Sequence, residues 1–211
     1  TDPRTAGLLR ALRLRAAPRV IVYGSTTGVY GDCRGDWVDE TRQLAPATDR
    51  AHRRVHAEQQ LRAFGRVSGA RATILRIPGI YAPDRPAGTP RERLLRGTPA
   101  LRTADDVYTN HIHADDLARA VVAACWRGRA QRVVHASDDS DLRMGDYFDC
   151  AADLYDYGRA STERARERLS PMLLSFMSES RRLVNQRLKE ELRVRLRYPT
   201  VAIGLAGDPG G

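Results

Sequence analysis

Three short runs of apolar, mostly β-branched residues are separated along the chain by stretches with helical spacing. The runs cover residues 19–24, 72–77 and 132–136. Runs of this length that do not alternate with polar residues are typical of strands buried on both faces, as in parallel sheets. Because helices separate them, we predict three neighbouring parallel strands joined by right-handed crossovers.

The stretches between these runs repeat their apolar residues every three to four positions, which predicts amphipathic helices. The helices are expected over residues 5–14, 49–68, 114–126 and 144–155. In the third helix, Leu117, Val121, Val122 and Cys125 lie on one face.

The remaining segments carry weaker signals. Residues 83–106 are rich in proline and charge, which predicts an excursion from the sheet that covers a site. Residues 107–112 are expected to be extended, and residues 173–196 to be basic and partly helical. Asn185 is the predicted N-cap of a helix over residues 186–192.

Composition indicates a single globular unit. The chain has 211 residues, of which 42% are hydrophobic. No apolar run approaches the roughly 20 residues that cross a bilayer, and no signal-like start is present, so a cytoplasmic protein is predicted. Cys33, Cys125 and Cys150 have neither close pairing nor metal-ligand spacing, and reduced thiols are expected.

The chain carries a formal net charge of +9, which raises the possibility of nucleic-acid binding. Its arginines are nevertheless scattered along the whole chain, many on the polar faces of predicted helices, and Lys189 is the only lysine. A small-molecule substrate, no nucleic acid and no membrane are therefore predicted, and nucleic-acid binding through the arginines is the third hypothesis for function.

Small hydroxyl residues and glycines follow the first predicted strand, in the stretch GSTTGVYGD. Ligands in open α/β sheets bind beyond the carboxyl ends of the strands, where Ser25, Thr26 and Thr27 are expected. Their hydroxyls would be placed to hydrogen-bond a substrate or cofactor. The alternative interpretation is a polar turn without a ligand.

This stretch resembles the S-[ST]-x-x-V-Y-G-D signature of the extended short-chain dehydrogenase/reductases, the NAD(P)-dependent sugar epimerase/dehydratase family. The tail from Ser178 resembles an atypical branch of that family. Four further stretches agree with the family in order: WVDE (37–40), LRIPGIYAP (75–83), NHIHADDLA (110–118) and VVHASD (133–138).

The resemblance implies an α/β fold, the C-terminal part of a Rossmann-type doubly wound parallel sheet with a small substrate-covering region. Residues 1–82 and 107–140 are assigned to the NAD(P)-binding part, and residues 83–106 and 141–211 to the covering region. The family sheet has seven strands, so four strands and the glycine-rich turn are expected before Thr1, and the chain is expected to be a fragment or processed form. NAD or NADP is the expected cofactor, bound weakly by this chain alone, and self-association through an open sheet edge is expected.

The resemblance also implies roles for individual residues. Thr26 takes the position of the family's catalytic Ser/Thr, and Thr27, Tyr81 and Asn110 are expected at the substrate. Although Asn110 lies close to His111 and His113, no metal site is predicted. The residues expected at the cofactor are Ser25, Thr26, Arg54, Pro78, Gly79 and Ile80.

Two departures from the family pattern bear on catalysis. The Tyr-x-x-x-Lys pair is replaced by Arg50 and Arg54, and arginine cannot act as a base near neutral pH. The Asp-Glu pair of family dehydratases is replaced by Thr27 and Gly28. The leading hypothesis is an atypical or weakly active NAD(P)-dependent oxidoreductase that acts on a nucleotide-sugar-like or related hydroxyl substrate. The alternative is a non-catalytic nucleotide-sensing or binding protein on a Rossmann frame.

Overall fold

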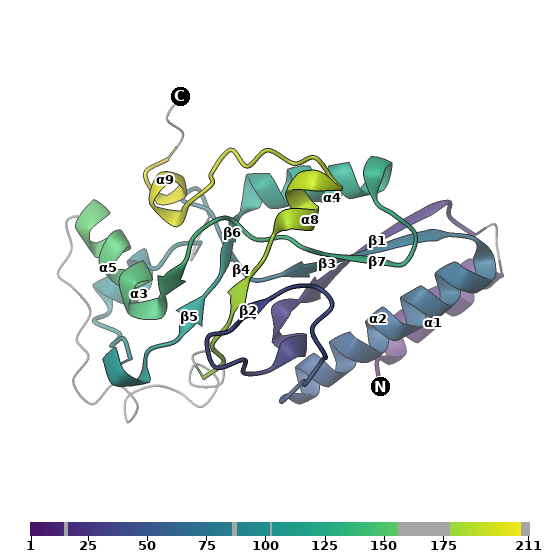
Figure 1. The fold of residues 1–211 in the computed structure, drawn as a ribbon, viewed down its shortest axis with the longest axis horizontal. Helices are drawn as coiled ribbons and strands as arrows, with labels where there is room; N and C mark the ends of the chain where they lie inside the picture. Colours follow the sequence, from purple (N-terminus) through teal and green to yellow (C-terminus); the bar gives the residue numbers. More distant parts are fainter. Residues whose placement is uncertain (15–16, 86–87, 102, 156–177, 208–211) are drawn as a thin grey trace.

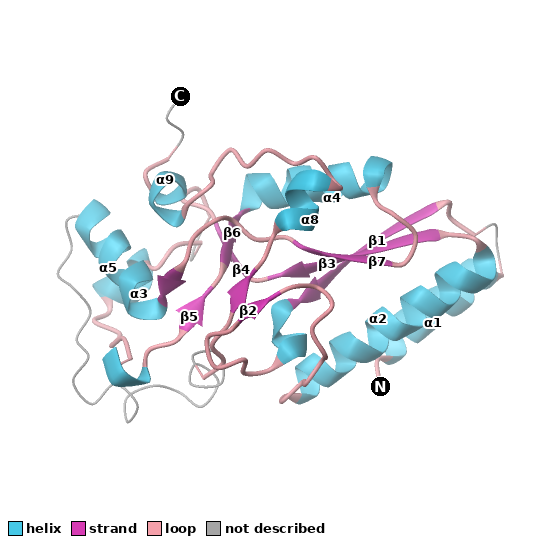
Figure 2. Cartoon of the chain, viewed as in Figure 1, coloured by secondary structure: helices cyan, strands magenta, loops and turns pink. Residues whose placement is uncertain are grey.

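A parallel three-stranded sheet forms the centre of the protein (Figures 1 and 2). The computed structural model describes residues 1–14, 17–85, 88–101, 103–155 and 178–207. The sheet order is β1 (Val20–Thr26), β3 (Arg71–Ile77), β7 (Arg132–His135), and both pairs are parallel. The predicted α/β class and the three parallel strands are confirmed.

Helices cover both faces of this sheet, as in a doubly wound fold (Figure 1). Helices α1 (Pro3–Arg13) and α2 (Asp49–Ser68) lie on one face, where Leu9, Leu61 and Phe64 form a buried cluster. Thr48 caps α2 through its side chain, and Gly69 ends the helix in the left-handed conformation. Helices α4 (Ala114–Arg127) and α8 (Gln186–Glu190) lie on the other face, over Leu75 and Val134.

The face of α4 that packs on the sheet is not the one that carries Val121 and Val122. The buried residues of α4 include Ala120, Ala123 and Ala124, whereas Val121 and Val122 are 38% and 59% exposed. Alanine has no side-chain atoms beyond Cβ, so these positions let the helix approach the strands closely. Close packing on the strands therefore places the small side chains, and not the valines, against the sheet.

A buried ion pair joins α2 to the central strand. Arg76 of β3 donates from Nη2 to Oε2 of Glu58 at 2.7 Å, and both side chains are almost fully buried. Ser25 donates to Oε1 of the same carboxylate, while Nη1 of Arg76 donates to the Tyr30 hydroxyl at 2.6 Å. The Tyr30 hydroxyl is also 2.5 Å from Nε2 of His135 on β7. This network connects the Ser/Thr turn to all three strands of the sheet.

A second apolar core lies beyond the carboxyl ends of the sheet strands. Two small pairs of strands are present there: β4 (Gly79–Tyr81) with β6 (His111–His113), parallel, and β5 (Tyr108–Thr109) with β8 (Leu142–Arg143), antiparallel. Tyr81, Leu94, Phe148 and Val201 belong to its buried cluster. The helical elements around it are α3 (Arg91–Leu95), the 3₁₀ turn η2 (Thr103–Asp105), α5 (Met144–Leu154) and α9 (Val201–Leu205).

Part of the tail packs against the sheet. After the 3₁₀ turn η1 (Thr27–Tyr30), strand β2 (Trp37–Val38) pairs in parallel with β9 (Arg182–Leu183). Helix α8 then packs on β7, so this part of the segment assigned to the covering region belongs to a helix layer of the sheet. Asn185 stands at the N-cap position, but its side chain donates to the carbonyls of Ser137 and Asp138. Residues 173–177 of the predicted basic segment lie outside the described residues.

Strand β1 has a free edge among the described residues, because it pairs with β3 alone. Residues 20–23 are only half-buried, whereas the five inner residues of β3 are buried. An unpaired apolar strand edge is a template for another chain.

We expect the 211-residue chain to associate in size-exclusion chromatography with light scattering, and Val20→Lys to reduce the association. Val67→Lys, at an exposed position of α2, is the control for the added charge. A monomer at high concentration would contradict this expectation.

Candidate functional site

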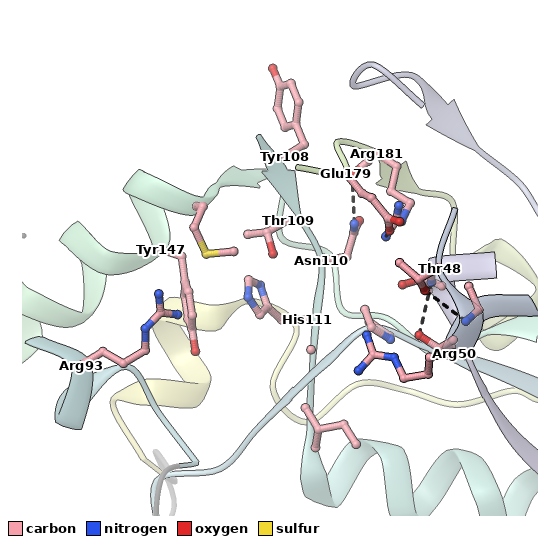
Figure 3. A pocket seen from close by; sticks show the side chains of 18 residues that line it. Thr48, Arg50, Arg93, Tyr108, Thr109, Asn110, His111, Tyr147, Glu179 and Arg181 are labelled. Atoms are coloured by element: carbon pink, nitrogen blue, oxygen red, sulfur yellow. Dashed lines mark hydrogen bonds and ion pairs between the residues drawn. The ribbon is translucent and has the colours of Figure 1, made fainter. Parts of the chain in front are cut away.

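A pocket of about 320 Å³ lies where β1 and β3 end, between the sheet and the second core (Figure 3). This is the position at which open α/β sheets bind ligands. Its volume is at the lower end of the range for small-molecule sites, enough for one ring system with its substituents. The lining residues come from the end of β1 and the start of η1, the start of α2, the turn after β3, α3, the 108–111 segment, α5 and the tail.

The floor of the pocket is the point at which β1 ends and η1 begins. Thr26, Thr27 and Gly28 line it, and Thr26 is the N-cap of η1. Oγ1 of Thr26 accepts a hydrogen bond from the Gly28 amide at 3.2 Å, so its own hydrogen is left to donate to a ligand. The sequence predicted Thr26 and Thr27 at this site, and the structure brings both to the pocket.

The turn after β3 forms a second wall. Pro78, Gly79 and Ile80 line the pocket, and the Gly79 amide donates to the carbonyl of Asn110. A Cβ added at Gly79 would lie 3.1 Å from Cδ2 of His111 and 3.3 Å from that carbonyl oxygen. The absence of a side chain here lets the backbone lie close to β6 and keeps this wall open to a flat ring.

The opposite wall comes from the second core. In Figure 3, Arg93 and Tyr147 lie side by side, across the pocket from Arg50. The His111 ring is tilted against Tyr147 with centroids 4.1 Å apart. Burial raises the pKa of Tyr147 and lowers the pKa of His111 to about 3. Both groups are therefore neutral at pH 7, and Tyr147 keeps its proton.

Arg50 reaches the pocket from the first turn of α2, and Arg54 does not. Arg50 and Ala51 line the pocket beside Thr48 (Figure 3). Arg54, one turn further along, donates to the Tyr23 hydroxyl at 2.8 Å and lies over the Tyr23 ring. Arg54, predicted at the cofactor, is therefore not among the residues that line the pocket, and Tyr23 on β1 holds its guanidinium.

Two other predicted site residues also lie away from the pocket. Ser25 is buried, and its hydroxyl donates to Glu58 in the network below the sheet end. Tyr81 is buried in the second core, where its hydroxyl lies 3.4 Å from the carbonyl oxygen of Thr200. Alternation along a strand explains both positions: Ser25 and Tyr81 point to the face opposite to that of their pocket-lining neighbours Thr26 and Ile80.

Asn110 lines the pocket as predicted, and its side-chain amide is hydrogen-bonded to the tail. Its Nδ2 donates to the carbonyl of Arg181 and its Oδ1 accepts from the Leu183 amide, both at 2.9 Å. Asn110 therefore fixes the tail against the pocket in the structure.

The tail contributes two charged residues that the sequence analysis missed, Glu179 and Arg181. Nη2 of Arg181 donates to Oε2 of Glu179 at 2.7 Å. The only sequence signal was that both lie in the tail stretch that resembles an atypical branch of the family; no periodicity pointed to a site. The described residues contain no group of three or more potential metal ligands.

The parallel sheet, its two helix layers and a pocket at the strand ends define a Rossmann-type nucleotide-binding fold of the extended short-chain dehydrogenase/reductase class. The model of the NAD dependent epimerase/dehydratase family matches residues 4–136. The chain belongs to this family. Among curated proteins, no match was found. No helix in the described ranges has both the length and the apolar character that crossing a membrane requires.

Solved structures agree with this assignment. A functionally unknown conserved protein from Silicibacter pomeroyi is 34% identical, with a TM-score of 0.82, and the match covers 97% of this chain and 71% of that one. RMD from Pseudomonas aeruginosa, complexed with NADPH, is 17% identical with a TM-score of 0.76 and coverages of 99% and 71%. UDP-glucose 4-epimerase from Thermotoga maritima, with UDP-glucose, is 20% identical with a TM-score of 0.79 and coverages of 97% and 66%. The latter two show the fold alone.

Proposed function

We propose that this chain forms the nicotinamide and substrate side of an atypical NAD(P)-dependent epimerase/dehydratase-like oxidoreductase. The substrate class is a nucleotide-sugar-like or related hydroxyl compound. The observation that carries the proposal is the pocket at the carboxyl ends of β1 and β3, which Thr26 and the Pro78–Gly79 turn line together. The structures similar to this chain include proteins complexed with NADPH and with UDP-glucose, which supports this ligand class.

The residues of the pocket fit the nicotinamide end of a dinucleotide. The wall at Gly79 has no side chain, and Ile80 beside it offers an apolar surface for a ring. When bound, the nicotinamide would accept or donate a hydride. The chain's own residues would orient the ligand: Thr26 through its hydroxyl, and the Gly79 backbone through close approach.

A second candidate is a nucleotide-sensing protein without catalysis. It is favoured by the loss of the Tyr-Lys pair: Arg50 stands in the pocket, and Arg54 is held by Tyr23. The neutral Tyr147 is a poor base because burial raises its pKa. Both candidates require nicotinamide dinucleotide binding, and they differ in hydride transfer.

Titration of NADH and NADPH into the ¹⁵N-labelled chain tests the proposal. We expect amide shifts at Thr26, Gly79 and Ile80, with a dissociation constant weaker than about 1 µM because only one end of the dinucleotide is contacted. Gly79→Val should abolish the shifts, since its side chain would meet His111 and narrow the wall. Gly7→Val, at an exposed site with open space around it, is the matched control.

If neither NADH nor NADPH shifts these amide signals, the proposal is contradicted. If the nucleotides bind, incubation with NAD⁺ and UDP-glucose separates the two candidates. Formation of NADH or of an altered sugar supports the oxidoreductase, because an epimerase or dehydratase returns the hydride to the sugar and accumulates no NADH. Binding with neither product supports the sensor.

A further inference from the structure

This protein has no side chain at the position where family dehydratases carry a glutamate. A carboxylate from the tail lies next to that position. Gly28 occupies that position. A Cβ added to Gly28 would lie 3.6 Å from Oγ1 of Thr26 and 3.8 Å from Oε2 of Glu179. The Thr26 hydroxyl and the Glu179 carboxylate therefore converge on one point at the floor of the pocket, although 153 positions separate them in the sequence.

The backbone beside Glu179 is held on several sides. The Ser180 amide donates to Oδ1 of Asp32 at 2.9 Å, and its carbonyl accepts from the amides of Cys33 and Gly35 at 3.0 Å. The Ser180 hydroxyl accepts from the Tyr108 amide at 3.0 Å. A carboxylate whose backbone is fixed in this way keeps a defined geometry, as an acid–base group requires.

Burial and nearby charges act on Glu179 in opposite directions. Three charged groups act on it: Arg181, which pairs with it, Arg50 across the floor, and Asp32. Burial raises the pKa of Glu179 above its ordinary value, and Asp32 adds to this, while the two arginines oppose it. Arg181 is itself buried, and its Nη1 donates to the carbonyl of Gly31. The ion pair thus orients one carboxylate edge.

We propose that Glu179 is the acid–base residue of this pocket, supplied by the tail in place of the missing tyrosine and glutamate. In the proposed step, a ligand hydroxyl gives its proton to the carboxylate of Glu179: the ligand O–H bond breaks, and an O–H bond forms on the carboxyl. Thr26 donates its hydrogen to the same ligand oxygen, and Arg50 faces the charge that develops there (Figure 3). This inference rests on the proposed function, because it assumes a hydroxyl ligand at this site.

The test compares the full chain with Glu179→Gln, Glu179→Asp and the control Glu190→Gln, which changes an exposed glutamate of α8. UDP-glucose is the probe, with NADH present. Calorimetry in buffers of different ionisation enthalpy counts the protons exchanged on binding between pH 5 and 9. We expect a pH-dependent proton count for the unmodified chain, Glu190→Gln and Glu179→Asp, and its loss in Glu179→Gln. Glutamine retains an acceptor for Arg181, and thermal melting verifies that each variant is folded.

If turnover occurs, Glu179→Gln should lower kcat about 100-fold with little change in KM and remove the acid limb of the pH profile, and Glu179→Asp should restore part of the rate. Equal proton counts in Glu179→Gln and the unmodified chain would overturn the role of Glu179, while intact NADH binding would leave the proposed function standing. Failure of the unmodified chain to bind NADH would overturn the proposed function, and this inference with it.

Discussion

Replacing Arg76 by methionine is expected to lower the free energy of unfolding by about 3–5 kcal/mol, the cost of leaving a buried charge without its partner. Glu58 would lose the contacts from Nε and Nη2 of Arg76 and keep only the Ser25 hydroxyl. The Tyr30 hydroxyl would lose its charged donor as well. Urea unfolding followed by circular dichroism measures the change.

Arg96→Met is the matched control for this prediction. Arg96 also donates to a carboxylate, Glu92, at 2.7 Å, but the two side chains are 71% and 45% exposed. An exposed pair contributes at most about 1 kcal/mol, so the control should unfold almost as the unmodified chain does. Arg76→Met combined with Glu58→Leu removes both charges and should recover part of the loss. Equal effects of Arg76→Met and Arg96→Met would refute the role assigned to the buried pair.

Replacing Gly31 by alanine is expected to lower the free energy of unfolding by about 3 kcal/mol or more, because backbone strain and steric overlap act together. Gly31 has φ +65° and ψ −156°, a conformation essentially restricted to glycine. An added Cβ would overlap the backbone carbonyl oxygen of Ala45, which cannot rotate away as a side chain can. Because the Gly31 carbonyl also accepts from Arg181, a shift here would displace the Arg181–Glu179 pair.

Gly69→Ala separates strain from overlap. Gly69 has φ +74° with nothing within 4 Å of an added Cβ. The strain of a left-handed alanine should therefore be the whole effect, and the free energy of unfolding should fall by about 1–2 kcal/mol. Unfolding in urea gives both values, and the amide spectrum should show shifts at Glu179 and Ser180 for Gly31→Ala alone. A loss no larger for Gly31→Ala than for Gly69→Ala would contradict the overlap.

Much of the fold was determined by local patterns that the sequence displays directly. The helix predicted over residues 49–68 is α2 with the same bounds, because Thr48 caps its start and Gly69 ends it. The three apolar runs became three parallel strands, with bounds shifted by one or two residues. Thr26, Thr27 and Pro78–Ile80 reach the pocket because the carboxyl ends of parallel strands meet at one edge of the sheet.

Other features depended on contacts between distant segments, which no local pattern encodes. Because side chains alternate along β1 and β4, Ser25 and Tyr81 point into the interior. Arg54 donates a hydrogen bond to Tyr23 on β1 and does not line the pocket. Glu179 lies at the pocket because distant segments hold Ser180 and Arg181, among them the 31–35 loop, about 150 positions earlier. Local patterns therefore predicted the three strands of the sheet, the four longest helices and the end of the sheet at which the pocket lies. Which charged groups line the pocket depended on the tertiary structure, because side-chain directions and long-range hydrogen bonds form only when the layers pack.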